Sequence, residues 1–234
     1  GSRHVEVTAT VDNGARDHFL RACFPAGFRA ERTCADGSFA VIDYPTEPDL
    51  TRELARHPVQ LWCDLHEGDR GLALLSRWTR DYEVMPDGDD HVVARSVTRG
   101  VRLRIPCDNR LWMECPGDES SQGLGRTTHE YAVMPHARAW HEDAVYREAL
   151  AYNHPLKAVQ FAPQTGRLPA RFSFVEIDDP NLVLSAVTKA EDRDSVLIRF
   201  YNPTTTDITA EIRTGFDFAA ACTVSLAGER GDAL

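Results

Sequence analysis

The sequence predicts an all-β protein built as an antiparallel β-sandwich, and three observations lead to this fold class. Short segments in which apolar and polar residues alternate recur along the 234 residues, and loops rich in Gly, Asp and Pro separate them. No long helical pattern stands between successive strands, as it would in a βα barrel. The hydrophobic content of 42% is enough to bury a core.

The first strand pattern begins at Val5, where Val5, Val7, Ala9 and Val11 alternate with polar residues as in a half-buried strand. Further strands are predicted for each later segment with the same alternation or with a short apolar run. These segments cover residues 17–24, 38–44, 59–65, 71–77, 81–85, 91–97, 129–134, 171–177, 182–189, 195–202, 207–213 and 222–227.

Two short helices are expected among the strands. The first spans residues 47–57, with Pro48 near its start and Pro58 at its end. The second spans residues 139–152, because its apolar residues can share one face of a helix. The residues of this apolar face are Trp140, Ala144, Tyr146 and Leu150.

Composition changes divide the predicted chain into two parts. Gly1 and Ser2 are typical of a cloning scar, and residues 3–179 form the main sandwich. A boundary is expected at Asp178-Asp179-Pro180-Asn181, after which four strands with Thr-rich connections form a smaller β-unit over residues 180–234.

Charge and cysteine content restrict the function classes. A net charge of −10 and a pI near 5.3 argue against nucleic acid as a partner, because phosphates require a basic face. No apolar run approaches the length of a membrane span. The six cysteines include no CxxC pair and no regular framework, which is typical of reduced thiols in a cytoplasmic bacterial protein.

The sequence offers no recognisable catalytic constellation or metal motif. The HxH, HxxxH and HExxH spacings are absent, and so are the GxSxG elbow and a dinucleotide fingerprint. His129 and Glu130 are adjacent on a predicted strand, and their side chains therefore point to opposite faces. We predict no catalytic residue and no metal ligand in this chain.

The order of several segments resembles the C-terminal β-region of glycoside hydrolase family 38, the α-mannosidase family. The run from Gly123 to Leu156 begins with a glycine-rich loop, continues through the strand ending in Met-Pro-His, and closes at Asn-His-Pro. Phe19 stands where this pattern usually has an arginine. The other segments in family order cover residues 10–13, 17–25, 38–42, 57–64, 71–75 and 81–84.

The resemblance implies a galactose-mutarotase-like supersandwich fold and a place in a longer enzyme. In that family an upstream barrel carries an aspartate nucleophile and a zinc ion, and no segment here matches those motifs. The resemblance therefore implies that this chain scaffolds a barrel of the same polypeptide that acts on mannosides, with no cofactor of its own. A sandwich separated from its barrel is also expected to self-associate through an apolar patch or an edge strand.

The same resemblance places a loop at residues 118–126 beside the sugar pocket in some family members. Within it we predict Glu119, Gln122 and Arg126 as substrate-binding residues, because amide and guanidinium groups suit sugar hydroxyls. A solvated loop that docks on a partner domain is the competing interpretation.

Two other functions stay open at this point. A stand-alone carbohydrate-binding module would present aromatic rings on an exposed face for sugar stacking. An aldose-epimerase-like enzyme would need a His and a Glu that meet at one sugar, which the adjacent His129 and Glu130 cannot do on a strand.

Overall fold

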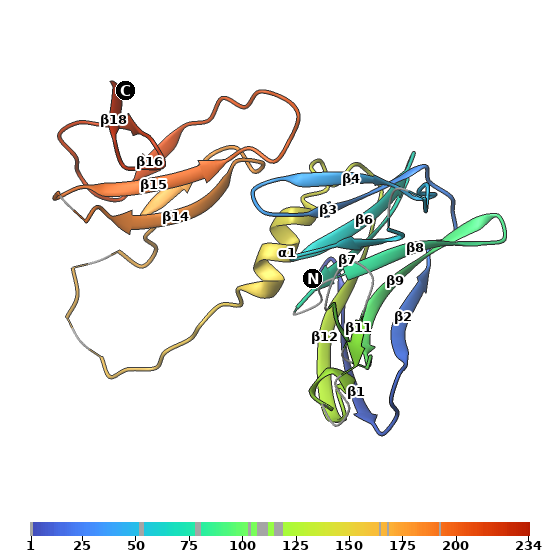
Figure 1. Cartoon of the computed structure of the whole chain (residues 1–234). Helices are drawn as coiled ribbons and strands as arrows, with labels where there is room; N and C mark the ends of the chain where they lie inside the picture. Colours follow the sequence, from blue (N-terminus) through green and yellow to red (C-terminus); the bar gives the residue numbers. More distant parts are fainter. Residues whose placement is uncertain are drawn as a thin grey trace. The chain divides into compact units, whose positions relative to one another are not determined.

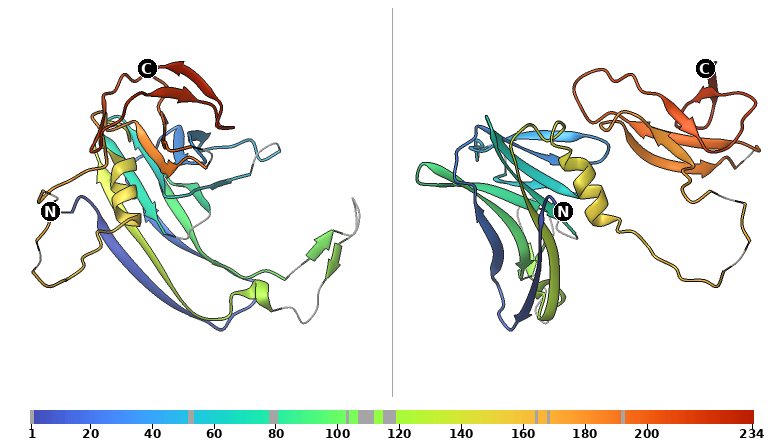
Figure 2. Two further views of the ribbon diagram at one scale, coloured as in Figure 1. Left: turned by 90° about the vertical axis from the view of Figure 1, so that its left-hand side faces the viewer. Right: turned by 180° about the vertical axis from the view of Figure 1, so that it is seen from behind.

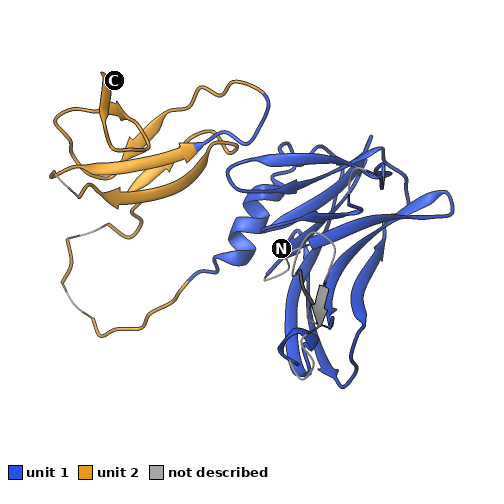
Figure 3. Cartoon of the chain, viewed as in Figure 1, with its two compact units in different colours: residues 1–156, 201–205 blue, residues 157–200, 206–234 orange. Residues whose placement is uncertain are grey.

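The structure, a computed structural model, describes residues 2–51, 54–77, 81–102, 104–106, 112–114, 119–163, 165–167, 169–191 and 193–234. Figure 3 shows the two compact units of the chain. The first comprises residues 1–156 and 201–205, and the second comprises residues 157–200 and 206–234. The units thus divide after Leu156, whereas the sequence placed a division near Pro180. The assignment of residues 3–179 and 180–234 to two domains stays a prediction.

The first unit contains two antiparallel sheets whose faces pack together (Figures 1 and 2). The larger sheet has the order β1 (Val5–Asn13), β12 (Gly125–His136), β7 (Arg70–Ser76), β6 (Trp62–Glu67), β3 (Arg32–Asp36) and β4 (Val41–Pro45). The smaller sheet has the order β2 (Phe19–Pro25), β9 (Asp90–Arg99), β8 (Asp81–Asp87) and β5 (Arg56–Pro58). The predicted all-β sandwich is therefore confirmed.

The remaining strands form two-stranded ribbons. In the first unit β10 (Arg104–Pro106) pairs with β11 (Trp112–Glu114). The ribbons of the C-terminal part are β13 (Val175–Ile177) with β16 (Ile212–Thr214), β14 (Val183–Lys189) with β15 (Val196–Tyr201), and β17 (Cys222–Val224) with β18 (Arg230–Ala233). No helix in the described residues is long and apolar enough to cross a bilayer.

The core of the sandwich lies between the two sheets. Strand alternation directs Cys63 and Leu65 of β6 inward, opposite Leu74 and Leu72 of β7. From the smaller sheet, Tyr82, Val84 and Val93 join the same cluster. This inner layer holds the two sheets together, because each of these side chains leaves water on folding.

A second apolar layer covers the outer face of the larger sheet. The helix α1 (Val145–Asn153) packs on β6 and β7 there (Figure 1). Trp62 is fully buried, and its ring lies 5.4 Å from that of Trp140 and 6.3 Å from that of Tyr146. The larger sheet is thus buried on both faces beneath α1.

Neither predicted helix matches the structure fully. The described part of residues 47–57 contains no helix, and Arg56–Pro58 instead forms β5. This strand places the His57 ring in a stack 3.9 Å from the Tyr44 ring, so tertiary packing overrides the local helical pattern. The second helix begins at Val145 rather than residue 139, because Ala144 has a left-handed φ of 57°.

Sequence reasoning missed the strand β3 and predicted several C-terminal strands too long. Thr33 and Ala35 of β3 face the inner core, but the flanking Arg32 and Asp36 conceal this short pattern. Cys23, Cys34, Cys63 and Cys222 are free thiols. Cys107 and Cys115 lie outside the described residues.

Candidate functional site

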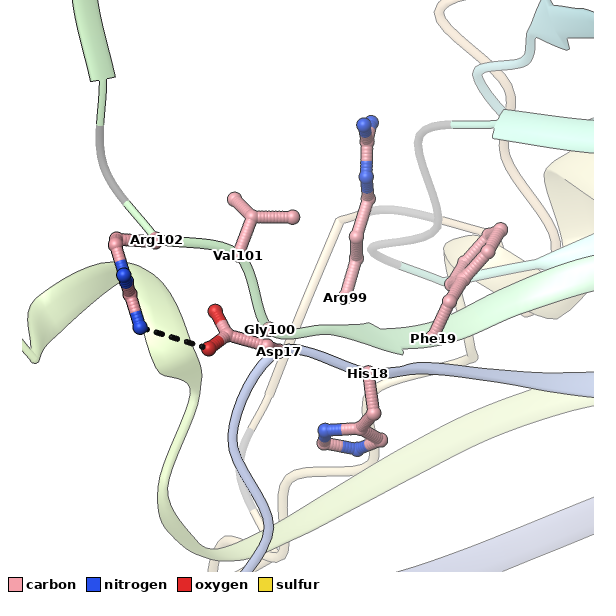
Figure 4. Close-up of a pocket in the computed structure, with 7 residues that line it drawn as sticks. All are labelled: Asp17, His18, Phe19, Arg99, Gly100, Val101 and Arg102. Carbon is pink, nitrogen blue, oxygen red and sulfur yellow. Dashed lines mark ion pairs between the residues drawn. The ribbon is translucent and has the colours of Figure 1, made fainter. Parts of the chain in front are cut away.

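A hollow lies at one tip of the sandwich, where β2 begins and β9 ends (Figure 4). Phe19 is paired with Arg99, and the backbone N–H of Gly100 donates to the carbonyl of His18 at 2.8 Å. This pairing brings residues 17–19 next to residues 99–102. The residues that line the hollow are Asp17, His18, Phe19, Arg99, Gly100, Val101 and Arg102.

The loop predicted to contact sugar lies directly beside this hollow. Residues Ser120–Gln122 form a short 3-10 helix. The Val101 N–H donates to the Ser121 carbonyl at 3.1 Å, and the Ser121 hydroxyl donates to the Val101 carbonyl at 2.6 Å. These reciprocal hydrogen bonds fix the loop against the hollow. Asp118, the first residue of the predicted loop, lies outside the described residues.

Gln122, a predicted substrate-binding residue, is buried and already hydrogen-bonded within the protein. Its Oε1 accepts from the Asp17 N–H at 2.8 Å, and its Nε2 donates to Asp17 Oδ1 at 3.0 Å. The Asn13 amide donates to the carbonyls of Gln122 at 3.1 Å and Gly123 at 2.9 Å. Gln122 therefore connects the loop to the β1–β2 connection.

Gly100 completes this packing because a side chain would not fit there. A Cβ at Gly100 would lie 2.9 Å from the Gln122 carbonyl oxygen and 3.1 Å from its Oε1. The backbone of β9 can therefore approach the loop only with glycine at this position.

Glu119 and Arg126, the other two predicted residues, precede and follow Gln122 in the sequence, and both have exposed side chains. Glu119 accepts a hydrogen bond from Arg16 Nε at 3.1 Å. Arg126 lies at the start of β12, opposite Asp12 of β1. The three predicted residues thus belong to one loop, but a role in sugar binding stays a prediction for each of them.

Sequence reasoning missed the residues that surround this loop. Arg99 and Arg102 carry positive charge into the hollow, and among the described residues Asp17 is the one acid that lines it, with its carboxylate 3.7 Å from Arg102 Nη2. Asn13 and Asp17 were part of the family pattern in the sequence. Sequence spacing could not reveal their contact with Gln122, because both residues precede it by more than one hundred positions in the sequence.

A second polar cluster lies on the outer face of the larger sheet, beside α1. His136 Nε2 lies 2.7 Å from Asp64 Oδ1, and His136 Nδ1 lies 2.7 Å from the Arg138 carbonyl oxygen. Both partners are acceptors, so both ring nitrogens carry a proton. Burial lowers the pKa of His136, but the hydrogen bond and charge of Asp64 outweigh burial, and its pKa is raised.

Asp143 links this cluster to the segment that leads into α1. Its carboxylate accepts the N–H groups of Ala137 and Arg138 at 2.9 Å, and it pairs with the Arg138 guanidinium at 2.7 Å. These hydrogen bonds from the backbone, followed by the Arg138 charge, lower the pKa of Asp143. The cluster is buried and away from the tip, and it therefore fits a structural role.

Within the described ranges, no three His, Cys, Asp or Glu side chains gather as a group able to hold a metal ion. His129 and Glu130 also have separate partners. His129 Nε2 lies 2.9 Å from the Thr127 hydroxyl, whereas Glu130 pairs with Arg77 at 3.1 Å. The two side chains do not form a His–Glu pair.

Comparison with known proteins matches both ends of the chain to one family. The profile of the glycosyl hydrolases family 38 C-terminal domain matches residues 1–100. The profile of the glycosyl hydrolases family 38 C-terminal beta sandwich domain matches residues 181–234.

The similar proteins are much longer than this chain. A putative mannosylglycerate hydrolase of Halalkalibacterium halodurans is 25% identical over 87% of this chain and 22% of its own length. The mouse protein named alpha-mannosidase 2C1 is 28% identical over 78% of this chain and 16% of its length. An α-mannosidase structure from Enterococcus faecalis shares the fold with a TM-score of 0.83 at 22% identity, covering 98% of this chain and 25% of that protein. The chain therefore belongs to glycoside hydrolase family 38, as the C-terminal β-sandwich region of that family.

Proposed function

We propose that this chain is the non-catalytic β-sandwich portion of an α-mannosidase-like hydrolase, in which it scaffolds a zinc-bearing catalytic barrel. The chain spans about a fifth of the length of the curated relatives, which are named as mannosidases or as a mannosylglycerate hydrolase. The described residues bring no acid pair or metal-binding group into the tip hollow. The resemblance assigns the aspartate nucleophile and zinc to the barrel.

We further propose that the loop with Glu119, Gln122 and Arg126 lies at the rim of the sugar pocket. The network between Gln122, Asp17 and Asn13 carries this proposal, because it holds the loop rigid without using the exposed side chains of Glu119 and Arg126. A rigid loop with exposed polar side chains can orient a sugar at little entropic cost.

The scaffold role is tested by expressing the longer natural enzyme with and without this region. Deletion is expected to abolish mannosidase activity and to lower solubility, because the proposed scaffold role implies that the barrel loses the surface that covers it. A truncated enzyme with wild-type activity and an unchanged Tm would contradict the scaffold role.

The rim role is tested in the longer enzyme by Arg126→Ala and Glu119→Gln. Loss of one charge-assisted hydrogen bond to substrate is expected to raise KM for an aryl α-mannoside about 10-fold. Arg230→Ala is the matched control, since Arg230 is also exposed but lies in β18 of the other unit. If all three variants retain the wild-type KM, the loop does not contact substrate.

A stand-alone carbohydrate-binding module has less support. Trp62 is fully buried, and Trp140 packs against it. Trp78 lies outside the described residues, as does the side chain of Trp112. Of the Phe, Tyr and Trp side chains in the described residues, Phe19 alone lines the hollow, and the guanidinium of Arg21 lies 5.1 Å from the centre of its ring.

A further inference from the structure

Arg95 of β9 is a charged residue inside the sandwich. It is 1% exposed, and it lies between Tyr82 of β8 and Ala22 of β2 in the sheet. Tyr82 belongs to the core cluster, so the Arg95 side chain also enters the space between the sheets. Its guanidinium carbon lies 4.2 Å from the centre of the Tyr131 ring.

The guanidinium of Arg95 has no hydrogen-bond partner in the part of the chain that the structure describes. This holds for Nε, Nη1 and Nη2 alike. Burial lowers the pKa of Arg95, and the groups that oppose this effect are Tyr131, Cys63 and Tyr152 rather than a carboxylate. A buried cation without a counter-charge is strongly unfavourable, and one tyrosine face offsets only part of that cost.

Arg77 shows what a complete arginine site looks like in this fold. Its guanidinium also lies over a tyrosine, 4.1 Å from the centre of the Tyr152 ring. In addition it pairs with Glu130 at 3.1 Å and donates to the Tyr152 carbonyl. Arg95 has the aromatic partner but lacks the carboxylate and the carbonyl.

Apolar side chains of the two edge strands nearest Arg95 are only partly covered by the described residues. Val7 of β1 pairs with Tyr131 of β12, so Val7, Ala9 and Val11 lie on the same face of the sheet as the Tyr131 side chain. All three are only half-buried. Leu20 of β2 is 38% exposed. β1 and β2 are edge strands of the two sheets, so apolar surface remains accessible along this side of the sandwich.

We propose that Arg95 binds a side-chain carboxylate from a segment of the longer polypeptide outside these 234 residues. The segment enters along the edges β1 and β2, its apolar side chains cover Val7, Ala9 and Leu20, and its carboxylate accepts from the Arg95 guanidinium in a bidentate pair. An apolar surface around one cation fits a peptide segment better than a free ion. The large share of the relatives' length outside this chain supplies such a segment.

This inference rests on the proposed scaffold role, and it is tested by a stability measurement that does not depend on activity. Arg95→Met keeps the side-chain length and removes the charge. In the isolated chain it is expected to raise Tm by a few degrees, because an unpaired buried charge is removed. In the longer polypeptide it is expected to lower Tm, because the carboxylate loses its partner. Arg77→Met is the control and should lower Tm in both proteins.

Two other results for Tm overturn the inference. A lower Tm for Arg95→Met in both proteins means that the counter-charge comes from within the 234 residues. A higher Tm in both means that no partner exists. If the variant does not fold in isolation, an experimental structure of the longer wild-type polypeptide decides. The inference fails there if no carboxylate of another segment lies within hydrogen-bond distance of Arg95, even when the mannosidase activity depends on this region.

Discussion

The imidazole of His136 occupies the space that a side chain on residue 71 would need. The two residues are direct partners across β12 and β7, and a Cβ at Gly71 would lie 2.2 Å from His136 Cε1. Asp64 and the Arg138 carbonyl hold the ring at its two nitrogens, and the ring therefore cannot move aside. One glycine thus makes room for the buried polar cluster beside α1.

Gly71→Ala is therefore expected to destabilise the protein by about 3 kcal/mol, the upper range for overpacking a rigid core. Chemical denaturation with fluorescence detection measures the loss. Gly14→Ala is the matched control, because a Cβ there meets nothing within 4 Å and Gly14 has no positive φ. Equal stability of the two variants would show that the His136 ring is free to shift.

The His136 cluster predicts a pH dependence of stability. The folded pKa of His136 is raised above the unfolded value of about 6.5, so its contribution is complete below pH 6.5 and is lost as pH rises through the folded pKa. Asp143 acts oppositely at low pH, because its lowered pKa gives stability above about pH 4 that is lost on further acidification. Together they favour the window between about pH 4 and pH 6.5.

The measurement compares Tm of the wild type and His136→Gln from pH 5.5 to 8.5. The stability difference between them should shrink as pH rises. His91 and His129 have pKa values lowered by burial and nearby arginines, and they contribute the reverse slope in both proteins. The difference between the two curves therefore isolates His136. A difference that does not change with pH would mean that His136 is not an imidazolium in the fold.

Asp36 fixes the beginning of β6 and is expected to be essential for the larger sheet. Its Oδ1 accepts the N–H groups of Gln60 at 3.2 Å, Leu61 at 2.7 Å and Trp62 at 3.1 Å. Asp36→Ala removes this acceptor from the Leu61 and Trp62 N–H groups, whereas the Gln60 N–H keeps the backbone carbonyl of residue 36 at 3.3 Å. The substitution should cost about 3 kcal/mol in unfolding free energy. Asp43→Ala on the exposed face of β4 is the control, expected to change stability by less than about 0.5 kcal/mol.

The isolated chain is expected to hydrolyse no aryl α-mannoside, with or without added zinc. The reason is that the described residues bring no pair of carboxylates to the tip hollow, as glycoside hydrolysis requires. The comparison is with a heat-killed sample, and turnover above that background contradicts the prediction. Calorimetry with free mannose should give a Kd of about 1 mM or weaker; micromolar binding would instead favour the binding-module interpretation.

Self-association is expected for the isolated chain. β1 is a nine-residue strand at the edge of the larger sheet, and Val5 on it is 65% exposed. Such an edge can pair with a second copy. Sedimentation velocity at increasing concentration should show a rising average mass, and Val5→Lys should reduce it. A single monomer species at high concentration would contradict this expectation.

Much of the fold could be predicted from the sequence because strand alternation is a local property. Val7, Ala9 and Val11 alternate where β1 forms, and the apolar run in residues 71–77 coincides with β7. The helix predicted at residues 47–57 failed for a nonlocal reason, since His57 is held between Tyr44 and Tyr82. The late start of α1 depends on Asp143, whose carboxylate binds the backbone of Ala137 and Arg138.

By itself the sequence determined the all-β class, the family and the loop in which Glu119, Gln122 and Arg126 lie, because these depend on residue order and local periodicity. Only the tertiary structure decided what each side chain contacts. Gln122 is buried because Asp17, more than one hundred residues earlier in the sequence, lies beside it at the same tip of the sandwich. The Arg95 guanidinium has no hydrogen-bond partner among the described residues. Such contacts join residues far apart in sequence, and no local pattern records them.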